Sequence, residues 1–205
     1  MNKKIGATIH ITIVNIMTGA IPSFSLPSGT TCSAQACKTC YVQGCYARKI
    51  EHLRPNVHKT YEENLMYAKK FPELLESYLN LYFSMANAPR FFRIHVAGDF
   101  FSRSYFEMWL RVISAHPHTM FLAFTKREAI IKPYLDKLPK NLSLVWSAWP
   151  GIPIPKSIHS KLTIAWMQDG TEDRIPQDAV QCPGKCEQCA KCWAMDGRHV
   201  VFDKH

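Results

Sequence analysis

Eight cysteines in two groups of four are the residues of this 205-residue chain whose type and spacing most directly indicate chemistry. The early quartet is Cys32-x4-Cys37-x2-Cys40-x4-Cys45, and the late quartet is Cys182-x3-Cys186-x2-Cys189-x2-Cys192. Clustered cysteines form disulfides, bind zinc or hold iron–sulfur clusters. The cellular compartment and the spacing of the thiols decide among these three.

The compartment that the sequence indicates disfavours disulfides. The stretch after Met1-Asn2-Lys3-Lys4 is interrupted by His10, Thr12 and Asn15 and alternates in the period of a β-strand, unlike the apolar core of a secretory signal. No run of about eighteen apolar residues is present, so no membrane span is predicted. We therefore expect a cytoplasmic protein, in which thiols stay reduced and clustered cysteines hold metal. The late quartet is also too compact for unstrained pairing within itself.

The late quartet has the tight spacing that is typical of cubane iron–sulfur clusters. Structural zinc sites more often join two Cys-x2-Cys knuckles across a longer loop, because four tetrahedral ligands approach the ion from different directions. We predict a [4Fe–4S] cluster here, with zinc as the alternative metal and inert structural thiols as a third interpretation. The role of Cys192 stays open, because one cysteine of such a run can serve a second cluster.

The early quartet follows the same logic with looser spacing. A loop that contains Gly29 and Gly44 can fold around a second [4Fe–4S] cluster without regular structure. If three of its thiols bind the cluster, the fourth iron is open to a small ligand and the site is catalytic. If all four bind, the site is structural. The spacing leaves both interpretations open.

Alternating strands and helices must position these groups. Strands are expected over residues 7–14, 91–97, 120–125, 142–147, 162–167 and 199–202. Helices are expected over 57–85, divided at Pro72, from a cap at Ser102 to about Pro117, and over 127–138, with loops at 22–45 and 149–155. This order predicts one α/β domain over residues 1–205, an open or partial (β/α) barrel with a largely parallel sheet, in which 176–197 is a cysteine-rich, cluster-binding segment.

Polar residues follow each expected strand, and the carboxyl ends of parallel strands meet at one edge of a sheet. The groups that follow the strands in chain order are the early cysteines, Gly98-Asp99, Thr125-Lys126, Ser147 and Gln168-Asp169-Gly170. We expect them to converge on one face, with the cysteine-rich loops at the same ends.

The charge of the chain indicates the class of partner that the protein binds. The chain has 25 Lys and Arg against 16 Asp and Glu, and 47% of its residues are hydrophobic, which excludes a disordered protein. A formal charge of +9 favours an anionic partner such as nucleic acid or a charged cofactor. One basic stretch lies beside the early quartet and is either a solvated helix face or a phosphate-binding rim: Arg48, Lys49, His52, Arg54, His58 and Lys59.

Other single residues favour structural roles. His95 in an apolar strand is more typical of a hydrogen-bonded core histidine than of a ligand. Lys126-Arg127 is more typical of a solvated pair. The tryptophans at 146, 149 and 166 lie on or beside strands, where core packing outweighs stacking on bases.

Several segments together resemble one family. They are Ser25-Leu26-Pro27-Ser28-Gly29-Thr30-Thr31-Cys32, Cys45-Tyr46-Ala47, Pro55-Asn56-Val57, Tyr61, Asn64, Arg93-Ile94-His95-Val96-Ala97-Gly98-Asp99-Phe100-Phe101-Ser102, Tyr105, Trp109, Phe124-Thr125-Lys126 and the Cys-Pro…Cys…Cys…Cys-Trp run at 182–193. Over roughly residues 20 to 200 the chain resembles the phage and mobile-element "gene product 88" family, whose members look like small relatives of the radical S-adenosylmethionine (SAM) enzymes.

That resemblance implies a cofactor and a place for it. It implies that the early quartet holds the cluster that faces SAM, and that Ala97-Gly98-Asp99 meets the methionyl amine, with Gly98 allowing close backbone approach and Asp99 accepting from the ammonium. Thr125 and Ser147 follow neighbouring strands and are assigned to the same cofactor site. The late quartet would then hold an auxiliary cluster. A phage-encoded protein of this kind would act in the host cytoplasm.

The early quartet departs from the usual Cys-x3-Cys-x2-Cys signature of radical SAM enzymes, which occurs here only at Cys182, Cys186 and Cys189. Two functions therefore stand. The first is reductive cleavage of SAM, with an unidentified substrate and an electron donor such as flavodoxin or ferredoxin. The second is a non-catalytic iron–sulfur or zinc module that binds nucleic acid through a basic surface.

Overall fold

The computed structural model describes residues 8–15, 18–194 and 198–203. Within these residues seven strands form one sheet in the order β1-β2-β3-β4-β5-β7-β6, and each pair of neighbours is parallel. The strands are β1 (Ser23–Phe24), β2 (Phe91–Ile94), β3 (Met120–Thr125), β4 (Leu142–Ser147), β5 (Thr163–Gln168), β6 (Val180–Gln181) and β7 (Val200–Asp203). β1 and β6 are the two edges, so the predicted open, parallel α/β sheet is confirmed.

Helices connect most of these strands. They are α1 (Ala34–Lys38), α2 (Cys40–Gly44), α3 (Tyr46–Leu53), α4 (Pro55–Lys70), α5 (Pro72–Ser84), α6 (Arg103–Ala115), α7 (Glu128–Ile131), α8 (Lys156–His159) and α9 (Cys186–Cys189), with 3-10 turns η1 (Lys132–Tyr134) and η2 (Lys191–Trp193). Pro72 separates α4 from α5 as predicted, because a proline fits the first turn of a helix but not its interior. Among the described helices, none is long and apolar enough to cross a membrane.

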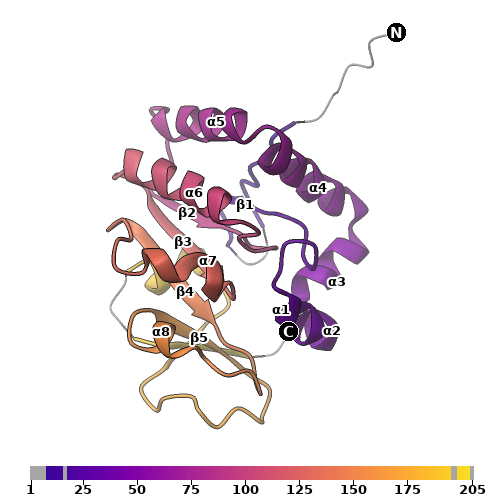
Figure 1. The fold of residues 1–205 in the computed structure, drawn as a ribbon, viewed down its shortest axis with the longest axis vertical. Helices are drawn as coiled ribbons and strands as arrows, with labels where there is room; N and C mark the ends of the chain where they lie inside the picture. The colour runs from indigo at the N-terminus through magenta and orange to yellow at the C-terminus, as the bar shows by residue number, and fades with distance from the viewer. Residues whose placement is uncertain (1–7, 16–17, 195–197, 204–205) are drawn as a thin grey trace.

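One face of the sheet carries the main hydrophobic core. Phe92 of β2 and Phe121 of β3 are fully buried there against Trp109 of α6. The Ser102 side chain accepts a hydrogen bond of 3.2 Å from the Tyr105 backbone, which caps α6 as predicted. Figure 1 looks onto this face: α6, α7 and α8 lie in front of the strands, and the yellow C-terminal segment lies behind them.

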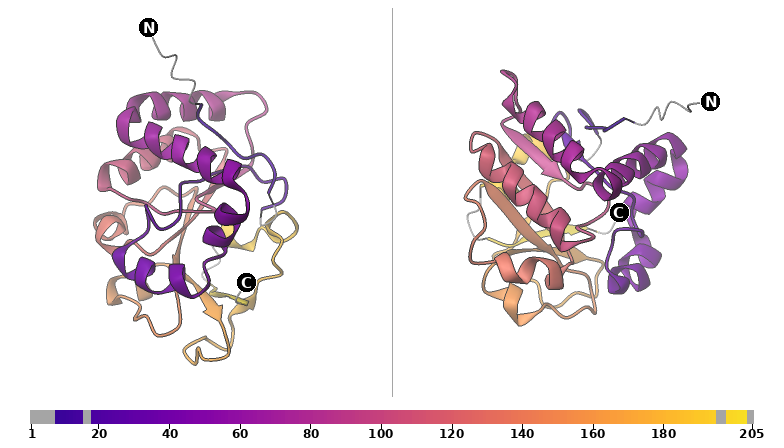
Figure 2. Two further views of the ribbon diagram at one scale, coloured as in Figure 1. Left: turned by 90° about the vertical axis from the view of Figure 1, so that its right-hand side faces the viewer. Right: turned by 45° about the horizontal axis from the view of Figure 1, so that its top comes forward.

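The opposite face is covered by the segment of the late quartet. The Trp193 ring is 2% exposed and packs with Leu122 of β3 and Val145 of β4. Its indole N–H donates to the Phe92 carbonyl at 3.3 Å, and the Ser143 hydroxyl donates to the Cys192 carbonyl at 2.5 Å. The late quartet is therefore held directly against the sheet. In Figure 2 this yellow segment and the indigo segment of the early quartet are both visible in the left-hand view.

The strand expected over residues 7–14 is wrong for the part of that range that the structure describes, 8–14. Thr12 makes only an antiparallel bridge to Ser23, and the first strand of the sheet is β1. The backbone of His10 is instead bonded to the Asn64 side chain of α4, with its N–H donating at 2.8 Å and its carbonyl accepting at 3.0 Å. A second 3.0 Å bond runs from the same amide to the Ser25 carbonyl. The buried asparagine thus supplies the polar partners that a neighbouring strand would have offered.

Three local differences have identifiable causes. The expected loop at 22–45 contains α1 and α2, and α1 begins where the Ser33 hydroxyl accepts from the Ala36 backbone at 3.1 Å. The expected helix over 127–138 is reduced to α7 and η1, because Pro133 cannot donate within a helix. The expected strand at 91–97 ends at Ile94, because His95 has φ +62°.

Candidate thiol-lined site

A cavity of about 450 Å³ lies on the face of the sheet opposite α6 and reaches the carboxyl ends of the strands. Three cysteines of each quartet line it: Cys32, Cys40 and Cys45 from the early quartet, and Cys182, Cys186 and Cys192 from the late quartet. Two groups far apart in the sequence thus share one cavity. All eight cysteines are half-buried free thiols.

Burial sets the protonation of these thiols. Burial raises the pKa of Cys32 to about 12, and the nearby Asp99 carboxylate adds to the effect. Burial also raises the pKa of Cys192 to about 12, although the Arg93 cation opposes it. In both cases nearby cysteines of the same quartet raise the pKa further, Cys40 and Cys45 for Cys32, and Cys182, Cys186 and Cys189 for Cys192. Within the described residues, no three Cys, His, Asp or Glu side chains are arranged to hold a single metal ion.

Arg93 places a positive charge in the cavity, and the sequence analysis did not predict this charge. Its guanidinium carbon lies 4.5 Å from the Phe124 ring centroid, and Nη1 lies 3.9 Å from the Cys186 sulfur. No carboxylate among the described residues lies within 4.0 Å of it, and its buried Nε has no hydrogen-bond partner there. Strand alternation could have indicated this position, because residues 91 and 93 share the face opposite Phe92 and Ile94.

His95 is a buried histidine that also lines the cavity. The residue is 2% exposed, and its Nε2 lies 3.0 Å from the Tyr105 hydroxyl. This agrees with the prediction of a hydrogen-bonded core histidine. Burial, helped by the Arg93 charge, lowers its pKa to about 3, so the ring is neutral near pH 7. Its Nδ1 is buried, and no described residue bonds to it.

The Asp99 carboxylate joins the ends of β2 and β3. Oδ1 accepts from the Phe100 N–H and the Thr125 hydroxyl, each at 2.7 Å, and Oδ2 accepts from the Lys126 N–H at 2.9 Å. Burial raises the pKa of Asp99, and these donors oppose the shift by stabilising the anion. Asp99 and Thr125 both line the cavity, but their polar atoms already have protein partners.

Gly98 is where the early loop approaches β2 most closely. Its φ is +82°, and a Cβ added there would lie 2.7 Å from the Leu26 carbonyl oxygen and from the Thr31 hydroxyl. The neighbouring Ala97 carbonyl accepts from the Leu26 N–H at 3.0 Å. The sequence predicted that a cofactor lies close to the Gly98 backbone. On the side where a Cβ would project, the loop that leads to Cys32 occupies this space instead.

The predicted groups converge with one exception. Ala97, Gly98, Asp99, Thr125 and Ser147 all line the cavity. Lys126 lines it too, and its Nζ donates to the Ser147 hydroxyl at 2.5 Å, so it is not the solvated residue that was expected. Residues 168–170 do not line the cavity.

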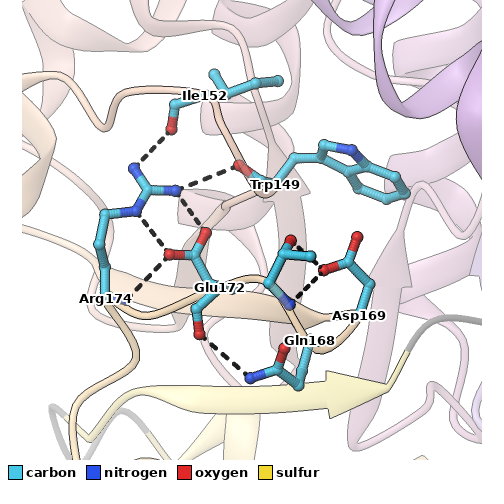
Figure 3. A network of polar contacts seen from close by, with 7 residues as sticks. Trp149, Ile152, Gln168, Asp169, Glu172 and Arg174 are labelled. Carbon is cyan, nitrogen blue, oxygen red and sulfur yellow. Dashed lines mark hydrogen bonds and ion pairs between the residues drawn. The ribbon is translucent and has the colours of Figure 1, made fainter.

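Residues 168–170 belong instead to the polar network of Figure 3, which holds the wall of the cavity. The Arg174 guanidinium donates to both Glu172 carboxylate oxygens, at 2.6 and 2.5 Å, and to the carbonyls of Ile152 and Trp149, at 3.0 and 3.5 Å. The Trp149 indole N–H reaches Gln43 of the early quartet segment at 2.9 Å. Trp149 therefore lines the cavity as well as packing in the interior.

An open parallel sheet that carries a thiol-lined cavity on the face opposite α6 defines a cysteine-rich α/β protein. The sequence matches the family model "Gene product 88" over residues 1–195, and the chain belongs to that family. It is 30% identical over 228 residues to the "Gene 88 protein" of Mycobacterium phage D29, covering 98% of this chain and 94% of that protein. It is 29% identical over 227 residues to the "Gene 88 protein" of Mycobacterium phage L5, with the same coverage. No solved structure matches the chain.

The close approach at Gly98 gives a first prediction. Gly98→Ala should lower the free energy of unfolding by about 3 kcal/mol, because a left-handed backbone and an overpacked contact add together. Gly170→Ala is the matched control: its φ is +92°, but a Cβ there meets nothing within 4 Å. It should cost about 1 kcal/mol, from the backbone alone. Urea unfolding of both variants measures the difference, and equal losses would contradict the tight packing.

The network around Trp149 gives a pH prediction. Hydrogen bonds from Arg174 hold the pKa of Glu172 below its ordinary value of 4.5. A carboxyl with a lowered folded pKa stabilises the protein fully above its unfolded pKa, and the contribution is lost as the pH falls through the folded pKa. Glu172→Gln should therefore be about 1 kcal/mol less stable than the wild type at pH 7, and this deficit should disappear as the pH falls through the folded pKa of Glu172.

Urea unfolding at several pH values measures this difference. Asp173→Asn is the control, because Asp173 is an exposed carboxylate of the same loop. It should stay within about 0.5 kcal/mol of the wild type throughout. A Glu172→Gln deficit that does not shrink in acid would show that the ion pair is not its cause.

Proposed function

We propose that the chain is an iron–sulfur protein that binds SAM in the thiol-lined cavity and cleaves it reductively while acting on a second substrate. What supports this proposal is the convergence of six thiols from two distant segments on one cavity at the carboxyl edge of a parallel sheet. In open α/β sheets this edge is where ligands bind.

The donor set fits two clusters. Thiolate sulfur is the ligand of iron in [4Fe–4S] clusters, and the eight free cysteines fall into two quartets along the sequence, with three members of each lining the cavity. The early quartet, Cys32, Cys37, Cys40 and Cys45, would hold one cluster. The late quartet, Cys182, Cys186, Cys189 and Cys192, would hold the other. Arg93, which lies beside Cys186 without a carboxylate partner among the described residues, supplies a positive charge of the kind that an anionic cluster needs.

When bound, a reduced [4Fe–4S] cluster would supply the single electron that cleaves SAM to methionine and 5′-deoxyadenosine, whose new hydrogen atom would come from the substrate or, where no substrate is present, from the protein or the buffer. The electron comes from an external donor such as flavodoxin or ferredoxin, in the reducing cytoplasm of a phage host. The protein itself positions the reactants and excludes water. Trp149, which lines the cavity, is 9% exposed and closes part of its wall against solvent.

The hydrogen bonds divide the predicted cofactor residues into two roles. Ala97, Asp99 and Thr125 are positioning residues, because their polar atoms already bond to the early loop or to one another. Ser147 and Lys126 present the polar groups that remain for a ligand. The Ser147 hydroxyl accepts from Lys126 and can still donate, whereas the unpartnered Nδ1 of His95 is buried away from solvent.

Iron content tests the clusters. Protein reconstituted anaerobically with iron and sulfide should hold about eight irons per chain, as two [4Fe–4S] clusters require. A triple variant of the early quartet, Cys32→Ser/Cys40→Ser/Cys45→Ser, should lose about half of the iron, and Cys182→Ser/Cys186→Ser/Cys192→Ser the other half.

Metal analysis and EPR of the reduced protein read out this result. Replacing Ser84, Ser157 and Ser160 by alanine is a control outside both quartets and should leave the iron content unchanged. Protein that takes up zinc in preference to iron, or that stays free of iron, would overturn the iron–sulfur assignment.

SAM cleavage tests the catalytic part separately. Addition of SAM to the reduced, reconstituted protein should change its EPR spectrum and release 5′-deoxyadenosine. Ser147→Ala should weaken SAM binding about fivefold, through the loss of one hydrogen bond of about 1 kcal/mol. Ser157→Ala removes a hydroxyl that bonds to Glu128 outside the cavity and should not change SAM binding. An iron-loaded protein with neither response would instead favour the non-catalytic iron–sulfur module.

A further inference from the structure

A second cavity, of about 630 Å³, lies beside the thiol-lined site. Four basic side chains line it, and we name it the basic cavity: Arg48, Lys49 and His52 of α3, and His58 of α4. The basic stretch at 48–59 is thus neither a uniformly solvated helix face nor a diffuse patch. The stretch also contains Arg54 and Lys59, which do not line the cavity.

The basic cavity has positive groups without an acidic counterpart. Arg48, Lys49 and His52 form no ion pair with any described carboxylate. Glu51 is the acidic residue among those that line the cavity, and it is only 7% exposed. Its Oε1 accepts from the Ser28 N–H at 3.0 Å, and its Oε2 lies 2.8 Å from His58 Nδ1. Both carboxylate oxygens of Glu51 therefore already have partners within the protein.

Arg48 is held in place by the early loop. Its guanidinium carbon lies 4.9 Å from the Tyr41 ring centroid, and Nη1 donates to the Tyr41 carbonyl at 3.3 Å. The Tyr41 ring is itself packed against Gly29, where an added Cβ would lie 2.8 Å from the ring carbon Cζ. A guanidinium stacked on a fixed ring is pre-organised, so it loses little conformational freedom when it binds an anion.

We propose that the basic cavity binds the phosphate group of a nucleotide or of a nucleic-acid strand. An arginine and a lysine without counterions, together with histidines, are the side chains that bind phosphate oxygens. The formal net charge of the chain, +9, favours the long-range attraction of such an anion. A concave wall encloses a phosphate on several sides, as a flat surface cannot.

The two cavities share part of a wall. Ser28, Gly44 and Cys45 line both of them. A phosphate ester in the basic cavity would therefore lie next to the early quartet. This inference goes beyond the proposed function, because it requires neither iron nor SAM, and it can be tested on protein without metal.

Binding of a fluorescein-labelled single-stranded oligonucleotide of about twelve nucleotides, measured by anisotropy over a range of salt concentrations, tests the proposal. Arg48→Gln/Lys49→Gln should make the slope of log K against log salt shallower by about 1.4, since each phosphate contact contributes about 0.7. The matched control is Arg54→Gln/Lys59→Gln, which removes the same charge from the same stretch outside the cavity. Its slope should change much less.

Competition experiments distinguish a small phosphate ester from a nucleic-acid strand as the source of the phosphate. If adenosine monophosphate or inorganic phosphate displaces the oligonucleotide at an equal concentration of phosphate, the ligand is a small phosphate ester. If the oligonucleotide binds far more tightly, the ligand is a strand. Lys49→Gln alone is a second variant in case the double variant does not fold, because Lys49 is exposed and its replacement should not disturb the fold. It should make the slope of log K against log salt shallower by about 0.7. Absence of binding at low salt, or equal losses in the cavity variants and the control, would overturn the proposal.

Discussion

Contact between the early cysteine loop and the turn after β2 is the interaction on which the thiol-lined site depends. Thr31 is buried at this contact, where its hydroxyl donates to the Pro27 carbonyl at 2.9 Å and accepts from the Asp99 N–H at 3.0 Å. Gly98 allows the two backbones to meet, and the Asp99 carboxylate extends the contact to β3. Because no side chain fits between the segments, the position of Cys32 follows from the position of β2.

The second quartet is fixed from the other side by packing rather than by a polar network. Trp193 fills the face of the sheet that the helices leave uncovered, and the thiols at 186 and 192 lie beside it. Arg93 is half-buried between Cys186 of this quartet and the Phe124 ring of β3, and its Nε is buried without a partner among the described residues. A group of negative charge beside it would stabilise this cation.

The match to the gene product 88 family gives the extent of the similarity along the chain, and the geometry of the site gives the contacts of its residues. The family match extends over residues 1–195 and therefore covers both quartets and the basic cavity, whereas Val200, Phe202 and Asp203 of the thiol-lined cavity lie beyond it. The geometry adds the distinction between residues whose polar atoms already have protein partners, such as Asp99 and Thr125, and Ser147, whose hydroxyl can still donate. The sequence analysis assigned Asp99, Thr125 and Ser147 to one cofactor site.

The sequence by itself determined the parallel α/β order, the strands at 120–125 and 142–147, the break at Pro72 and the cap at Ser102, because periodicity and caps act over a few residues. It also predicted that the early quartet, Gly98-Asp99, Thr125-Lys126 and Ser147 would meet, since parallel strands end at one edge. Only the tertiary structure decided that Asp99 bonds to the protein, that residues 8–14 pack on α4, and that Arg93 lies beside Cys186. These contacts join residues about 26 to 93 positions apart, and no local pattern encodes which partner a buried polar group will find.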